Sequence, residues 1–112
     1  MGTSKNFIFD NEIEWEYIND GMQRQILGYD DQIMLVKIKF MTGGVGSVHT
    51  HLHRQCTYVV SGIFEFEIDG EKKVVKTGDG LFMEPNIPHG VICLEAGLLI
   101  DAFSPVRADF LK

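Results

Sequence analysis

The strongest constraint on the fold is an alternation of apolar and polar residues with a period of two. In the segment 63–75, IFEFEIDGEKKVV, apolar residues alternate with acidic ones up to an Asp69-Gly70 pair. Successive side chains of a β-strand point to opposite faces of the sheet, and an Asp-Gly pair suits the tight turn of a hairpin. The segment 36–40, VKIKF, repeats the alternation. No segment shows a sustained 3.6-residue period, so the sequence predicts an all-β protein.

Turn-forming clusters divide the chain into many short segments, among them 19–21, 28–31, 42–46 and 77–80. Short strands at such spacing, with no helical segment between them, predict an antiparallel sandwich or a closed barrel. The alternation of Glu and apolar residues over 12–17 predicts one further strand. With 112 residues and no linker or internal repeat, we expect a single domain over 1–112.

The net charge, the apolar runs and the cysteines indicate which partners and which cellular compartment to expect. The formal net charge of −6 would repel nucleic acid and anionic membranes, so we expect neither as a partner. The chain has no apolar run long enough to span a bilayer and no secretory signal at its start, which predicts a cytoplasmic protein. Cys56 and Cys93 both lie in apolar runs, and we expect two buried free thiols.

The four histidines fall at two places, His49, His51 and His53 together and His89 much later. Alternate residues of a strand lie about 6.6–7 Å apart on one face, so neighbouring imidazoles there can converge on one cation. The period alone does not select the ligands among the first three. Surface or core histidines without a metal are the alternative interpretation.

Two segments around these histidines resemble the two motifs of the cupin family. Residues 46–62, GSVHTHLHRQCTYVVSG, resemble the first motif, in which a His-x-His pair precedes a Glu and a Gly. Residues 78–89, GDGLFMEPNIPH, resemble the second motif, with its Gly-Asp start, proline-containing turn and final ligand His. The resemblance implies a single-domain cupin, an antiparallel jelly-roll β-barrel.

The resemblance also implies a metal site made by His49, His51, Gln55 and His89, with His53 at the pocket edge or on the surface. Gln55 stands where most metal-binding cupins carry Glu, so the ligand set is neutral. Such a set is more typical of a Lewis-acid site than of the two-His, one-carboxylate iron oxygenases. We expect one divalent transition metal, Ni, Zn, Fe, Mn or Co. A cupin that has lost its metal is the alternative.

The C-terminal segment 97–112, GLLIDAFSPVRADFLK, places Asp101 and Phe103 at alternate positions. Alternation alone favours a surface Asp101 and a solvated Arg107 over a carboxylate inside the barrel. Together with the Gln ligand, however, this tail resembles that of the small pectin-degradation cupins that linearise unsaturated uronates. That resemblance implies an active site in which Asp101, Phe103 and Arg107 line the cavity beside the metal.

The implied reaction opens a 4,5-unsaturated monouronate, from pectin or alginate breakdown, to 5-keto-4-deoxyuronate. By this resemblance the partner is a small anionic sugar acid, Asp101 moves the proton and Arg107 holds the carboxylate. Two alternatives stay open: a metal-containing cupin that binds a sugar acid without turnover, and an Fe-dependent dioxygenase or sugar isomerase on the same fold. We also expect a homodimer that covers exposed outer strands.

Overall fold

The computed structural model describes residues 2–111 and consists of antiparallel strands joined by turns. The strands are β1 (Glu16–Asn19), β2 (Met22–Tyr29), β3 (Met34–Phe40), β4 (Val45–His49), β5 (Arg54–Ile68), β6 (Glu71–Lys76), β7 (Gly80–Met83) and β8 (His89–Ser104). Two short 3-10 helices, η1 (Asp10–Glu12) and η2 (Ala108–Phe110), flank them. The predicted all-β architecture is confirmed. Within residues 2–111, no helix is long and apolar enough to cross a membrane.

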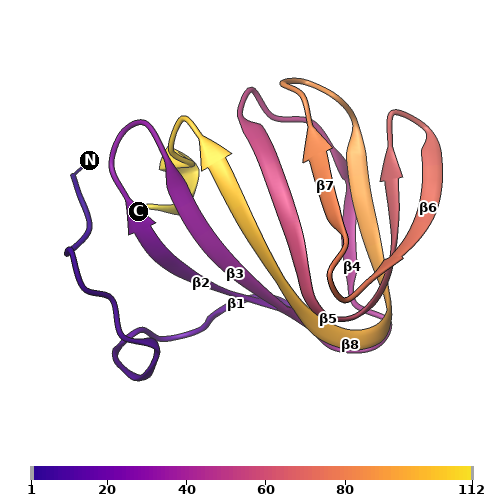
Figure 1. The fold of residues 1–112 in the computed structure, drawn as a ribbon, viewed down its shortest axis with the longest axis horizontal. Helices are drawn as coiled ribbons and strands as arrows, with labels where there is room; N and C mark the ends of the chain where they lie inside the picture. The colour runs from indigo at the N-terminus through magenta and orange to yellow at the C-terminus, as the bar shows by residue number, and fades with distance from the viewer. Residues whose placement is uncertain (1, 112) are drawn as a thin grey trace.

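Two long strands, β5 and β8, shape the barrel. Each runs along one wall, bends at the closed end and continues in the opposite wall (Figure 1). The second half of β8 pairs with β3 and the first half of β5, whereas its first half pairs with β4 and the second half of β5. One wall therefore contains β1, β2, β3 and β7, the other contains β4 and β6, and β5 and β8 belong to both.

The bend depends on a close crossing of two glycine backbones, Gly62 in β5 and Gly97 in β8. Gly62 has a φ of +92°, and a Cβ on it would lie 2.8 Å from the Cα of Gly97. A Cβ on Gly97 would lie 2.0 Å from the carbonyl oxygen of Ser61. Neither position accommodates a side chain. The register shifts here as well, so the inward residues of β5 change from odd to even numbers across the bend.

The core fills the closed part of the barrel with the inward residues that the alternation predicted. From β3, Val36, Ile38 and Phe40 are buried, and Phe40 meets Phe64 of β5 edge-on with 5.2 Å between ring centroids. The predicted hairpin is also present: Asp69 and Gly70 join β5 to β6, both with positive φ. Each such burial of a large apolar side chain contributes about 1.5–3 kcal/mol.

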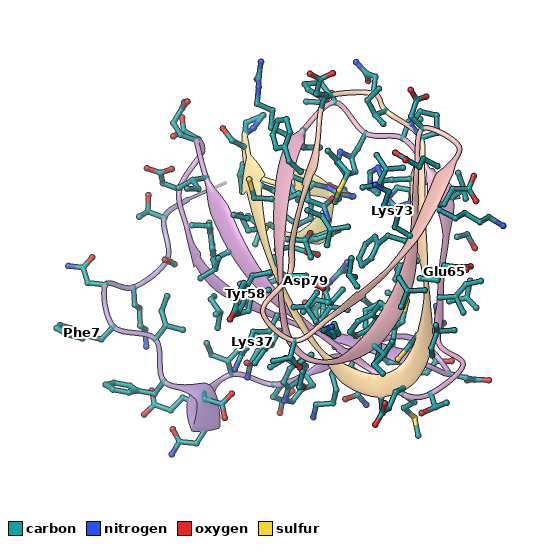
Figure 2. All side chains as sticks on the ribbon, turned by 45° about the vertical axis from the view of Figure 1, so that its right-hand side comes forward. Phe7, Lys37, Tyr58, Glu65, Lys73 and Asp79 are labelled. Atoms are coloured by element: carbon teal, nitrogen blue, oxygen red, sulfur yellow. The ribbon has the colours of Figure 1, made fainter. Side chains whose placement is uncertain are left out.

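Two local predictions were wrong. Cys93 is buried, but Cys56 is exposed, because β5 turns Gln55 and Thr57 inward and Cys56 to the outer face with Tyr58. Figure 2 shows Tyr58 and Lys37 on this outer face. The predicted strand over 12–17 begins only at Glu16, since Glu12 ends η1 and residues 13–15 belong to no strand. This N-terminal segment lies along the outside of the barrel, where Phe7 points away from it (Figure 2).

Candidate metal centre and active site

Three histidines converge inside the open end of the barrel. His49 ends β4 and His89 begins β8, and the two are directly paired across the strands. The ring of His51, from the loop before β5, lies 4.7 Å from that of His89 and 5.5 Å from that of His49. One ligand atom from each of the three lies within 4.8 Å of the others, a spacing at which these atoms could hold a metal ion.

Each of the three imidazole rings is oriented by a hydrogen bond between its Nδ1 atom and a backbone carbonyl. The Nδ1 atoms of His49, His51 and His89 lie 2.8, 3.0 and 2.9 Å from the backbone carbonyls of residues 47, 53 and 87. A carbonyl only accepts, so each Nδ1 carries the proton and each Nε2 keeps its lone pair. Backbone support of this kind is typical of metal-ligating histidines.

Two further observations fit a cation at this place. The Nε2 atom of His89 is buried and has no hydrogen-bond partner among residues 2–111. The Nε2 atom of His51 lies 3.0 Å from Oε1 of Gln55, so two lone pairs face each other, an arrangement that a shared cation would stabilise. Burial lowers the pKa of both His51 and His89, which keeps the two rings neutral and able to bind a metal near neutral pH.

Gln55 is held in its orientation by a chain of hydrogen bonds that continues away from the histidines. Its amide nitrogen donates to the Thr57 hydroxyl at 3.0 Å, and that hydroxyl donates to Oδ1 of Asp101 at 2.6 Å. The Asp101 carboxylate can only accept, so the Thr57 hydroxyl uses its one proton to donate to it. That hydroxyl can then only accept from Gln55, and the Gln55 group that donates is its amide nitrogen. The amide oxygen is therefore the atom that faces His51. Thr57 was missed by sequence reasoning because its link to Asp101 depends on the pairing of β5 with β8.

Asp101 is inside the barrel, only 7% exposed. The solvated position that alternation alone favoured is therefore wrong, and the buried position implied by the family resemblance is observed. Burial raises the pKa of this carboxyl to about 6, although hydrogen bonding by Thr57 and Gln55 opposes the shift. A carboxyl with such a pKa can both take up and release a proton near neutral pH.

The tail brings Phe103 and Arg107 to the same place. Phe103 is paired with Gln55 across the strands, and its ring lies 5.8 Å from that of His51. The Arg107 guanidinium lies over the rings of Phe103 and Phe110, and its Nε and Nη2 donate to the Asp109 carboxylate at 3.1 and 2.9 Å. Two of its donor atoms are thus already engaged.

One cavity of about 280 Å³ lies beside the histidine cluster and the C-terminal residues. Its walls include His49, His89, Asp101, Phe103 and Arg107. Its size is at the small end of the range for ligand pockets, which suits a single sugar ring better than an oligosaccharide. His53 is not part of the histidine cluster; its ring lies against those of His51 and Phe103.

A second arginine, Arg24 of β2, lines the same cavity and was not predicted. A signal for it exists in the sequence. Arg24 alternates with Met22 and Ile26, so it is a cation on the apolar, inward face of a strand. Its neighbour Gln25 faces the other way and is covered by the N-terminal segment, donating to the carbonyls of residues 10 and 13.

Comparisons with known proteins agree with this geometry. The family model described as a cupin domain matches residues 36–100. The chain is 45% identical to the pectin degradation protein KdgF of Dickeya dadantii, over 96% of this chain and 99% of the relative. Among solved structures, an RmlC-like cupin from Shewanella frigidimarina superposes with a TM-score of 0.95 at 45% identity, covering 98% of this chain and 99% of that one. KdgF from Halomonas sp. superposes with a TM-score of 0.90 at 38% identity, covering 96% and 99%. The chain therefore belongs to the cupin family and, within it, to the group of KdgF-like proteins.

Proposed function

We propose that this cupin linearises 4,5-unsaturated monouronates to 5-keto-4-deoxyuronate. The observation that carries the proposal is that a buried, protonatable Asp101 lines one cavity of single-sugar size together with His49 and His89 of the histidine cluster. The similarity to a pectin degradation protein over nearly the whole chain supports a role in the breakdown of such sugar acids.

The reaction moves one proton and needs neither an oxidant nor a reductant. The anomeric hydroxyl loses its proton, the bond between C1 and the ring oxygen breaks, and the ring oxygen leaves as an enolate at C5. Protonation of C4 then converts the enolate to the ketone. Asp101 would accept the proton from the hydroxyl and return one to C4, for which a pKa of about 6 is well placed.

The remaining residues bind and orient the sugar. A metal held by His49, His51, Gln55 and His89 would supply a Lewis acid that polarises substrate oxygens. Phe103 forms an apolar wall, and Arg107 offers its remaining Nη donors to the substrate carboxylate. These positive groups would make the pocket attractive to an anion although the whole chain carries a net charge of −6.

The proposal is tested by the loss of ultraviolet absorbance of freshly prepared 4,5-unsaturated galacturonate, after subtraction of its spontaneous opening. We expect rapid loss that a chelator stops and added divalent metal restores. No loss above background with fully loaded protein would overturn the proposal. Substrate-dependent uptake of oxygen would instead identify an oxygenase, and tight binding of an unchanged sugar acid would identify a binding protein.

A further inference from the structure

The cavity contains two guanidinium groups, and only one of them was expected. Arg24 enters from β2 and Arg107 from the segment after β8, so they approach the cavity from two different parts of the chain. Both stack on the same ring, Phe110 of η2, with 3.8 Å from the Arg24 guanidinium to the ring centroid and 4.2 Å from that of Arg107. The shared ring restricts the position of both side chains.

The two arginines differ in how far their donors are already used. Arg107 is 12% exposed and makes a two-pronged ion pair with Asp109. Arg24 is 20% exposed and has one long contact, 3.5 Å from its Nε to a carboxylate oxygen of Glu16. Among residues 2–111, no group accepts a hydrogen bond from either Nη atom of Arg24.

The charges around Arg24 indicate which kind of group would pair with its free Nη atoms. Among the described residues, 2–111, the only carboxylate that forms an ion pair with Arg24 is that of Glu16, which is itself 45% exposed and therefore well solvated. Asp109 is engaged by Arg107, and Asp101 is engaged by Thr57. Two like charges that share one ring repel each other, and an anion at the free Nη atoms of Arg24 would relieve that repulsion.

We propose that Arg24 binds the carboxylate of the sugar acid and thereby selects acidic over neutral sugars. This inference rests on the proposed function for the identity of the substrate. Both Nη atoms of Arg24 are free to pair with a carboxylate, whereas Asp109 already occupies the Nε–Nη2 edge of Arg107 and leaves that guanidinium fewer donors. Arg107 then adds its remaining Nη donors to the same carboxylate.

The test compares Arg24→Gln and Arg24→Lys with the wild type, all loaded with metal, on 4,5-unsaturated galacturonate. We expect Arg24→Gln to raise KM by roughly 10- to 100-fold, as for the loss of a charge-assisted pair of hydrogen bonds, with a much smaller change in kcat. Arg24→Lys keeps the charge but not the fork, so its KM should lie in between. Arg54→Gln removes one positive charge from the exposed outer face and is the matched control, with KM unchanged.

A second measurement separates this inference from the proposed function. Calorimetric titration of the loaded protein with D-galacturonate and with galactose, the neutral counterpart, needs no turnover. Weaker binding of galacturonate alone in Arg24→Gln supports the inference even if the wild type does not open the unsaturated sugar. The inference is overturned if the wild type turns over and both Arg24 variants keep its KM, or if the wild type binds galacturonate no better than galactose. Thermal unfolding of each variant verifies that it is folded, and Arg24→Lys alone decides the question if Arg24→Gln is not.

Discussion

The hydroxyl of Thr57 donates a 2.6 Å hydrogen bond to the Asp101 carboxylate from the strand directly beside it. Because the same hydroxyl accepts from the Gln55 amide, a residue that faces no substrate determines which atom of Gln55 is directed at the histidine cluster. This relay connects the proposed metal ligands to the proposed proton carrier.

Replacing Thr57 by Val removes the hydroxyl at nearly constant volume and should weaken metal binding by about 10- to 100-fold, the usual effect of losing a group that orients a ligand. The cause is the Gln55 amide, which can then rotate and present its nitrogen to His51. Competition with a fluorescent chelator measures the affinity. Thr57→Ser keeps the hydroxyl and should bind metal as the wild type does; equal affinity in the Val variant would show that the relay does not orient Gln55.

Asp101→Asn should lower turnover by at least about 100-fold, since the amide cannot carry the proton. The same change should stabilise the metal-free protein at neutral pH. The folded state holds the Asp101 proton up to about pH 6, whereas a free carboxyl loses it near 3.8. The unfolded state therefore binds fewer protons between these values, and wild-type stability falls as the pH rises through that window, by about 3 kcal/mol in total.

Urea unfolding of the two metal-free proteins at several pH values between 4 and 7 measures this difference. We expect the Asn variant to lack the decline that Asp101 causes in the wild type. Parallel stability curves for the two proteins would show that the carboxyl titrates normally, and the proton-carrying role would lose its physical basis.

Metal binding should stabilise the fold, because the ligands come from β4, the loop after it, β5 and β8. At a metal concentration 100 times the dissociation constant, the gain is about 2.7 kcal/mol. His89→Ala should abolish most of the metal-induced rise in Tm, whereas His53→Ala, which lies outside the histidine cluster, should keep it. A similar loss in both variants would place His53 among the ligands.

The outer face of the wall that carries β3, β8, β5 and β7 predicts a homodimer. The register aligns Leu35, Ala102, Cys56 and Phe82 in one row across these strands, and Leu35, Cys56 and Phe82 are exposed. A continuous apolar row on a monomer is a typical association surface. We expect a dimer by light scattering and a monomer for Phe82→Glu. Val74→Glu, an exposed apolar position on β6 of the opposite wall, should remain dimeric.

Local patterns predicted the parts of this molecule that depend on neighbours in the sequence. The strand alternation and the Asp69-Gly70 turn follow from spacing alone, as their geometry is set within a few residues. The grouping of His89 with His49 and His51 was implied only by the resemblance to the cupin motifs. Cys56 was wrongly predicted to be buried, because an apolar run does not reveal which of the two faces of its strand is covered by the core. Arg24 and Thr57 were not found, since their importance comes from partners brought near by strand pairing or tail packing. The pairing register between two strands that are distant in the sequence cannot be predicted from the residues of either strand alone.

The inward residues of β8 keep odd numbers on both sides of the bend, and this sets a limit on how this chain can change. His89, Leu99, Asp101 and Phe103 all occupy odd positions, and all lie on the inner side of the barrel. Deleting or inserting one residue between His89 and Asp101 would turn the carboxylate outward while leaving the histidine in place. The strand should therefore accept substitutions far more readily than changes in length, and variation among homologues should occur there as replaced side chains or as paired insertions.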